Sequence, residues 1–288
     1  MKEQNLENLS IVGNPNRKRK SNIDFGLADE LNKYYANPKN FKKKEENLEK
    51  KAKEGNGLII KPSGDLCFVT DIKLYNEIVE YLDKTFPKHK DILSGQLSFD
   101  DAEDVMKGSS TYITTGIGNY LKSINSEYGI ANQIDLEQNL DMFKGRYIDS
   151  GLALRNITNN INKSQAIHLF NQLKQRGLSE EDFPIYFNLR GLILDNNLNF
   201  NLTDESSYKL KAECLNWENG SHYSIVDNFG IPKEKNANSR RRIFTANKAL
   251  SGVFLYRDSD LGSGYDIFAL SFGDGRVVLA KKISGVQI

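Results

Sequence analysis

The pattern of apolar residues changes once along the chain, near Leu178, and this change constrains the fold more than any other feature. Before it, apolar residues recur at helical spacing, most clearly over residues 164–176. After it, short runs rich in β-branched and aromatic residues alternate with turn residues. We therefore predict an α+β fold: a mainly helical N-terminal segment with one β-hairpin, then an antiparallel C-terminal β domain that is sandwich-like or barrel-like.

The chain accordingly divides into three predicted parts. Residues 1–56 are polar and predict a flexible basic tail followed by a charged, solvated helix. Residues 57–177 predict a mainly helical domain, with a β-hairpin around the turn Pro62-Ser63-Gly64-Asp65. Residues 178–288 predict the antiparallel β domain.

Start and stop signals locate individual helices. Asp71 can cap a helix over residues 72–86, whose apolar residues fall on one face. The capping-box pattern at residues 98–101 predicts a second, short helix. The helix over residues 164–176 ends at Gly177, a residue suited to terminating it.

Strands are predicted from short apolar runs between turn residues, at 185–194, 198–202, 208–215, 223–226, 242–246, 252–256, 266–272 and 276–283. Gly273-Asp274-Gly275 separates the last two runs. Because Asp-Gly supplies the positive φ of a primed turn, this tripeptide predicts a β-hairpin.

Residues 256–266, YRDSDLGSGYD, carry three aspartates and two glycines between two apolar runs. Asp258, Asp260 and Asp266 could together hold Ca²⁺ or Mg²⁺, which prefer hard oxygen ligands. An EF-hand would close with a glutamate at position twelve of the loop, but Ala269 stands there, so that motif is excluded. A looser metal loop remains one interpretation.

The other interpretation of this segment is a β-hairpin. Residues 252–257 and 265–272 would be paired strands, and residues 258–264 their polar connection. Asp and Gly are the residues that such a turn selects without any ligand. We favour the hairpin.

Two basic clusters are candidates for binding a polyanion, and they are Arg17, Lys18, Arg19 and Lys20 in the tail and Arg240, Arg241 and Arg242 in a polar loop. The forked guanidinium group of arginine matches phosphate oxygens. Phe229 and Phe244, near the second cluster, could stack on bases or belong to the core. The alternative is a solvated loop whose last arginine enters a strand and faces outward.

Catalytic motifs are sparse. Gly116-Ile-Gly118, with Asp135 downstream, matches part of a dinucleotide fingerprint, but Leu121 occupies the third glycine position. We therefore predict that the two glycines lie in a loop leading into a helix. The three histidines are widely separated, and the sequence contains neither a phosphate-binding loop nor a nucleophile elbow.

Composition sets limits on partners and compartment. Lys and Arg number 39 against 38 Asp and Glu, so the formal net charge is +1. The protein as a whole therefore has no strong electrostatic field that would attract nucleic acid or membranes. Apolar runs are too short to span a bilayer, the start lacks the pattern of a signal peptide, and two distant cysteines predict free thiols. We expect a cytoplasmic protein without a membrane partner.

Three functions fit these patterns. The first, which we favour, is a binding protein that contacts nucleic acid or another polyanion through the basic clusters. The second is a metal-dependent hydrolase that uses the aspartates Asp258, Asp260 and Asp266, and Ca²⁺ or Mg²⁺ is the one cofactor the sequence suggests. The third is a structural or assembly protein whose β domain makes the contacts of a homo-oligomer.

Overall fold

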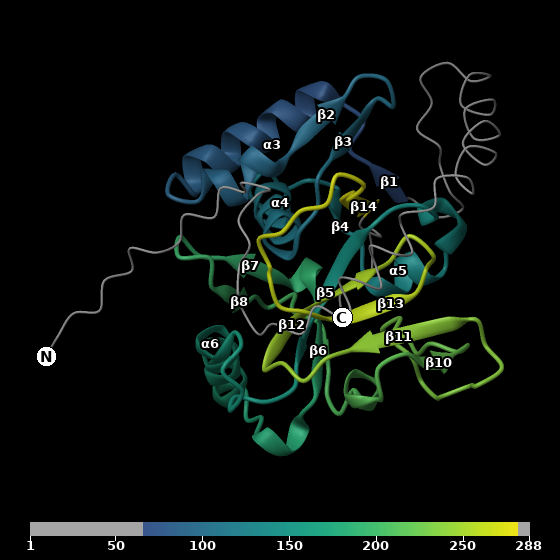
Figure 1. Cartoon of the computed structure of the whole chain (residues 1–288). Helices are drawn as coiled ribbons and strands as arrows, with labels where there is room; N and C mark the ends of the chain where they lie inside the picture. The colour runs from purple at the N-terminus through teal and green to yellow at the C-terminus, as the bar shows by residue number, and fades with distance from the viewer. Residues whose placement is uncertain (1–65, 282–288) are drawn as a thin grey trace, which may run out of the picture. The chain divides into compact units, whose positions relative to one another are not determined.

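A computed structural model describes residues 66–281 of the chain, and these residues belong to one compact unit (Figure 1). The predicted tail with its cluster Arg17 to Lys20, the solvated helix and the first strand and turn of the predicted N-terminal hairpin lie outside the described residues. No helix in the described range is both long and apolar enough to cross a membrane.

The centre of the unit is a seven-stranded sheet that curls into a half-barrel. Its order is β10 (Ser221–Tyr223), β11 (Arg241–Thr245), β13 (Leu261–Tyr265), β12 (Leu250–Leu255), β5 (Ile148–Leu154), β6 (Ile185–Asn188) and β9 (Tyr208–Lys209). All neighbours are antiparallel except β11 and β13, which run parallel. The parallel pair corrects the prediction of a purely antiparallel domain. It arises because the chain skips one position in the sheet between β11 and β12 and then returns as β13 into the position between them.

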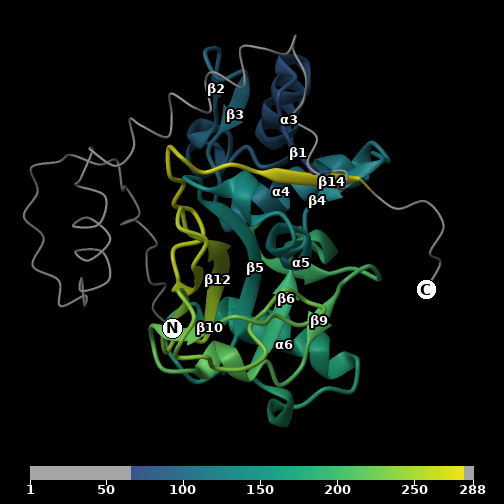
Figure 2. The ribbon, with the colours of Figure 1, turned by 90° about the vertical axis from the view of Figure 1, so that its right-hand side faces the viewer.

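Smaller elements surround this sheet. A three-stranded antiparallel sheet has the order β1 (Leu66–Phe68), β14 (Val278–Lys281) and β4 (Tyr128–Ile130), and Figure 2 shows β14 lying across the end of the large sheet. Two hairpins are formed by β2 (Ser98–Asp100) with β3 (Val105–Lys107) and by β7 (Leu192–Leu194) with β8 (Phe200–Leu202). The helices are α3 (Ile72–Thr85), α4 (Thr111–Ser123), α5 (Gln133–Glu137) and α6 (Lys163–Gln175).

The two predicted long helices are confirmed. In α3 the side chain of Asp71 accepts a hydrogen bond from the Lys73 backbone N–H at 2.8 Å, which is the expected N-cap, and Leu82 is fully buried. Helix α6 spans Lys163–Gln175, so each of its ends lies one residue before that of the predicted range 164–176.

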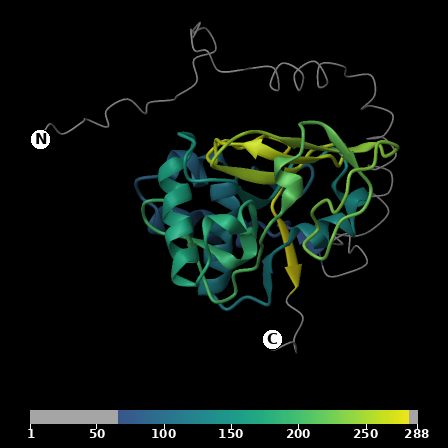
Figure 3. The same ribbon diagram turned by 90° about the horizontal axis from the view of Figure 1, so that it is seen from below.

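Two apolar cores lie on opposite faces of the sheet. Leu152 and Leu154 of β5 join the core formed with α3, α4 and α6, whereas Ala153 joins the core formed with α5 and β14. Figure 3 shows the long helices to one side of the strands drawn in green and yellow. Strand β5 pairs with both β6 and β12, so the predicted change of character at residue 178 falls between neighbouring strands of one sheet.

Two helix-related predictions are wrong. Residues 98–107 form the β2–β3 hairpin instead of a helix, because the Asp100 carboxylate accepts hydrogen bonds from the backbone of Ala102 and Glu103 and makes a turn. Gly116 and Gly118 lie inside α4, not before it. A Cβ on Gly116 would approach Leu82 to 2.8 Å, so the glycine allows α4 to pack closely on α3.

The predicted hairpin at Gly273-Asp274-Gly275 is also wrong. Strand β14 pairs with β1 and β4, and residues 266–272 form no strand. The reason is tertiary: Phe268 is buried in the core beside Tyr112 and Phe200, which holds this segment away from β14.

Candidate functional site

Arg241, the middle residue of the predicted basic cluster, faces the interior of the fold. Its guanidinium group makes a paired contact with the Glu137 carboxylate, with one N···O distance of 2.8 Å, and it donates to the Ser259 carbonyl at 2.7 Å. It also lies 4.7 Å from the centre of the Tyr223 ring. These contacts occupy the donors that phosphate recognition would require.

Arg242 faces the other side of β11, because successive residues of a strand alternate. Its backbone N–H and its Nε donate to the two oxygens of Asp260, at 2.6 and 3.1 Å. Its guanidinium carbon lies 4.9 Å from the centre of the Phe244 ring, two residues along the same face. Arg240, just before the strand, is exposed. The structure thus separates three consecutive arginines into one interior group and two that reach the surface.

The three aspartates of the predicted metal loop are held by different partners. Asp260 is buried and paired with Arg242, and burial raises its pKa. Asp266 lies 3.4 Å from Lys248, and Asp258 is exposed and accepts from the Asp260 backbone N–H at 3.2 Å. Among residues 66–281, no group of three or more His, Cys, Asp and Glu side chains is arranged to hold a metal ion.

This segment forms a hairpin as predicted, but its second strand is Leu261–Tyr265 and not residues 265–272. Strands β12 and β13 are antiparallel neighbours, and the turn between them is shorter than predicted, so that both glycines of LGSG lie within β13. Gly262 has a packing role: a Cβ there would lie 2.2 Å from the Phe254 ring. The glycine lets that ring lie flat across the sheet.

Six aromatic rings form a connected cluster on the face of the sheet that carries Arg242. We call it the aromatic cluster, and it consists of Tyr147, Phe244, Phe254, Tyr256, Tyr265 and Phe272. Neighbouring ring centres lie 4.7 to 6.0 Å apart. Tyr147, Phe254 and Tyr256 are buried, whereas Phe244, Tyr265 and Phe272 are partly exposed. The cluster therefore has a buried floor and an accessible rim.

A buried carboxylate lies beside the aromatic cluster. Asp149, on β5 opposite Phe254, accepts hydrogen bonds from the hydroxyls of Ser109 at 2.7 Å and Thr111 at 3.2 Å. Burial raises the pKa of Asp149 to about 7, although the two hydroxyl donors act in the opposite direction. Burial raises the pKa of Tyr265, and the charge of Asp149 raises it further. Asp149 can therefore gain or lose a proton near neutral pH.

A second buried charge lies just beyond the other end of β5. Arg155 donates from Nε to the Leu215 carbonyl at 2.7 Å, and its terminal nitrogens donate to the hydroxyls of Ser251 and Ser263 at 2.7 and 2.8 Å. It also donates to the Ser263 carbonyl. Burial lowers its pKa to about 10, so the side chain stays charged at neutral pH.

Sequence reasoning did not identify Asp149, Arg155 or the aromatic cluster. The signal for Asp149 was an acidic residue inside an otherwise apolar strand, IDSGLAL. Three of the six rings lie on the strands β11, β12 and β13 and three lie outside strands, and no spacing along the chain connects them. Comparison with protein-family models, with curated proteins and with solved structures found no match to this chain.

Proposed function

We propose that the protein binds single-stranded nucleic acid, or a polyanion of similar chemistry, at the rim of the aromatic cluster. The observation that carries this proposal is the stacking of Arg242 on Phe244, which places a cation and a partly exposed ring side by side on one face of the sheet. Aromatic rings on a sheet surface stack with bases, and neighbouring arginines contact the phosphates.

Two further features support the proposal. Tyr265 and Phe272 are partly exposed members of the same cluster, so more than one ring is available for stacking. Arg240 is exposed next to Arg242, where it can contact a phosphate without breaking an internal ion pair. Arg241 takes no part, because Glu137 and Ser259 hold it. The tail cluster Arg17 to Lys20 remains a predicted second contact.

The experiment measures fluorescence anisotropy of a labelled single strand of about 12 nucleotides, with a duplex of the same length as competitor. We expect the single strand to bind more tightly and its affinity to fall steeply between about 50 and 200 mM salt. Phe244→Ala should weaken binding by about tenfold, since each stacked base contributes about 1–3 kcal/mol. Arg240→Gln should reduce the slope of log affinity against log salt concentration by about the amount expected for one phosphate contact.

Phe99→Ala is the matched control, because Phe99 is a partly buried ring on β2, outside the aromatic cluster. It should leave oligonucleotide affinity unchanged. Absence of binding at low salt, or equal losses in Phe99→Ala and Phe244→Ala, would contradict the proposal.

The other two functions remain predictions with direct tests. A rise in melting temperature with Ca²⁺ or Mg²⁺ that is lost in Asp258→Asn would support the metal-dependent hydrolase. Light scattering at high concentration tests assembly, for which Ile267 and Leu270 offer exposed apolar side chains beside β13.

A further inference from the structure

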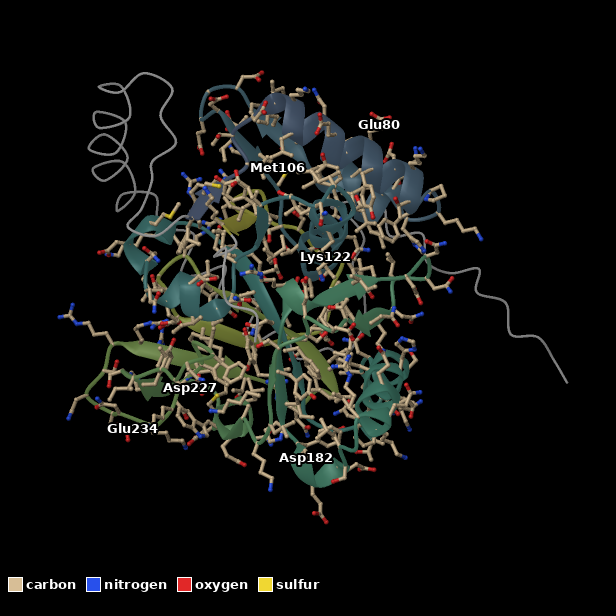
Figure 4. The ribbon with its side chains drawn as sticks, turned by 180° about the vertical axis from the view of Figure 1, so that it is seen from behind. Glu80, Met106, Lys122, Asp182, Asp227 and Glu234 are labelled. Carbon is tan, nitrogen blue, oxygen red and sulfur yellow. The ribbon has the colours of Figure 1, made fainter. Side chains whose placement is uncertain are left out.

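A small cleft lies between α4, β4 and the turn Leu189–Gly191, and none of its lining residues belongs to the aromatic cluster. Its lining is mixed: Leu121 and Ile130 are apolar, and the other residues are Gly118, Lys122, Tyr128, Gly129, Arg190 and Glu205. Lys122 is labelled in Figure 4, which shows the molecule from behind.

Arg190 is the main cation of this cleft. Its guanidinium group lies on the backbone of Gly129, where an added Cβ would be 3.2 Å from Nε and 3.6 Å from the guanidinium carbon. The side chain is half-buried, and among residues 66–281 nothing accepts a hydrogen bond from it or pairs with its charge. The guanidinium nitrogens are not fully buried, so their five N–H donors reach solvent and can instead bind an anion.

The surroundings of Arg190 favour a negatively charged ligand. Lys122 contributes a second cation, positioned by a contact of 3.4 Å between its Nζ and the Leu192 carbonyl. The space over the two glycines is filled, at Gly118 by the Ile130 side chain and at Gly129 by Arg190 itself, so Gly129 lets the guanidinium group lie close to the backbone. The one acidic residue of the lining, Glu205, is exposed to solvent.

We propose that this cleft binds a small oxyanion, a carboxylate or phosphate group, held by the forked guanidinium group of Arg190 with Lys122 as the second cation. Arginine suits this role because its planar donors match two oxygens of one anion. The site is separate from the proposed nucleic-acid surface and does not depend on it.

The test is an NMR titration of the full chain with sodium phosphate or sodium acetate, against sodium chloride at equal ionic strength. We expect saturable shifts of the backbone amide signals of Gly118 and Gly129 with an oxyanion and none with chloride. Tighter binding of phosphate would identify a phosphoryl ligand, and tighter binding of acetate a carboxylate ligand. Arg190→Gln should weaken binding by about tenfold, and Arg190→Lys, which keeps the charge, by less.

Two variants separate this site from a general effect of charge or folding. Glu205→Gln should strengthen oxyanion binding by about twofold, a gain that a folding defect would not produce. Arg240→Gln, which removes an exposed arginine elsewhere, should leave it unchanged, and Arg190→Gln should leave oligonucleotide affinity unchanged. Shifts that do not saturate, or equal affinity in Arg190→Gln and the wild type, would overturn the proposal.

Discussion

Strand β5 has a buried ionisable side chain near each end, and the two are accommodated in different ways. Asp149 has two hydroxyl donors and a pKa raised to about 7, whereas Arg155 is surrounded by carbonyl and hydroxyl oxygens and keeps a pKa of about 10. A buried carboxylate can avoid the cost of desolvation by taking up a proton. An arginine does not lose its proton at neutral pH, so the fold must supply acceptors for its N–H groups.

The two ends of β5 therefore differ in how their charge responds to pH. The Arg155 end is a fixed network that joins β12, β13 and the segment around Leu215, and its charge stays constant through the physiological range. The Asp149 end changes its charge within that range, next to the aromatic cluster proposed to bind a ligand.

The largest effect should come from removing the fixed charge. Arg155→Met leaves the Leu215 carbonyl without its donor and removes one of the two donors to the Ser263 carbonyl, and we expect a loss of about 3–5 kcal/mol in the free energy of unfolding. Urea denaturation at pH 7 measures this loss. A loss below about 1 kcal/mol would show that the network stabilises little, and that the contrast between the two ends is mistaken.

The second effect should depend on pH. The folded-state pKa of Asp149 is raised above its unfolded value, so its contribution to stability is fully present below about pH 4 and is lost as the pH rises through about 7. Asp149→Asn cannot ionise. It should therefore be more stable than the wild type by about 2–4 kcal/mol near pH 8, with the difference shrinking towards pH 4.

Urea denaturation of both proteins at a series of pH values checks this expectation. A stability difference that stays constant with pH would remove Asp149 as the titrating group. Asp266→Asn is a suitable control, because that carboxylate is partly exposed and paired with Lys248.

The smallest effect should come from one hydroxyl. The Ser109 hydroxyl donates to Asp149 and lowers the pKa of that carboxyl against the effect of burial. Ser109→Ala should therefore raise the pKa further, by about one unit or less. The measurement is the ¹³C chemical shift of the Asp149 carboxyl group during a pH titration, and an unchanged or lower midpoint would contradict the assignment.

Local patterns were sufficient for some elements and not for others. Asp71 and the apolar spacing after it identified α3, and the acid and glycine residues between two apolar runs identified the β12–β13 hairpin. The same kind of pattern failed at residues 98–101 and at Gly273-Asp274-Gly275. There the outcome depended on the Asp100 turn and on burial of Phe268, which the capping-box and turn patterns do not report.

For this protein the α+β class, the helices α3 and α6 and most strand positions after residue 178 follow from the sequence, because these depend on the periodicity of neighbouring residues. The sequence did not show that Arg241 turns inward to Glu137, or that Asp149 lies beside the aromatic cluster. Each of these arrangements joins residues from different elements of the fold. Their partners are set by packing across the sheet, which a local pattern does not contain.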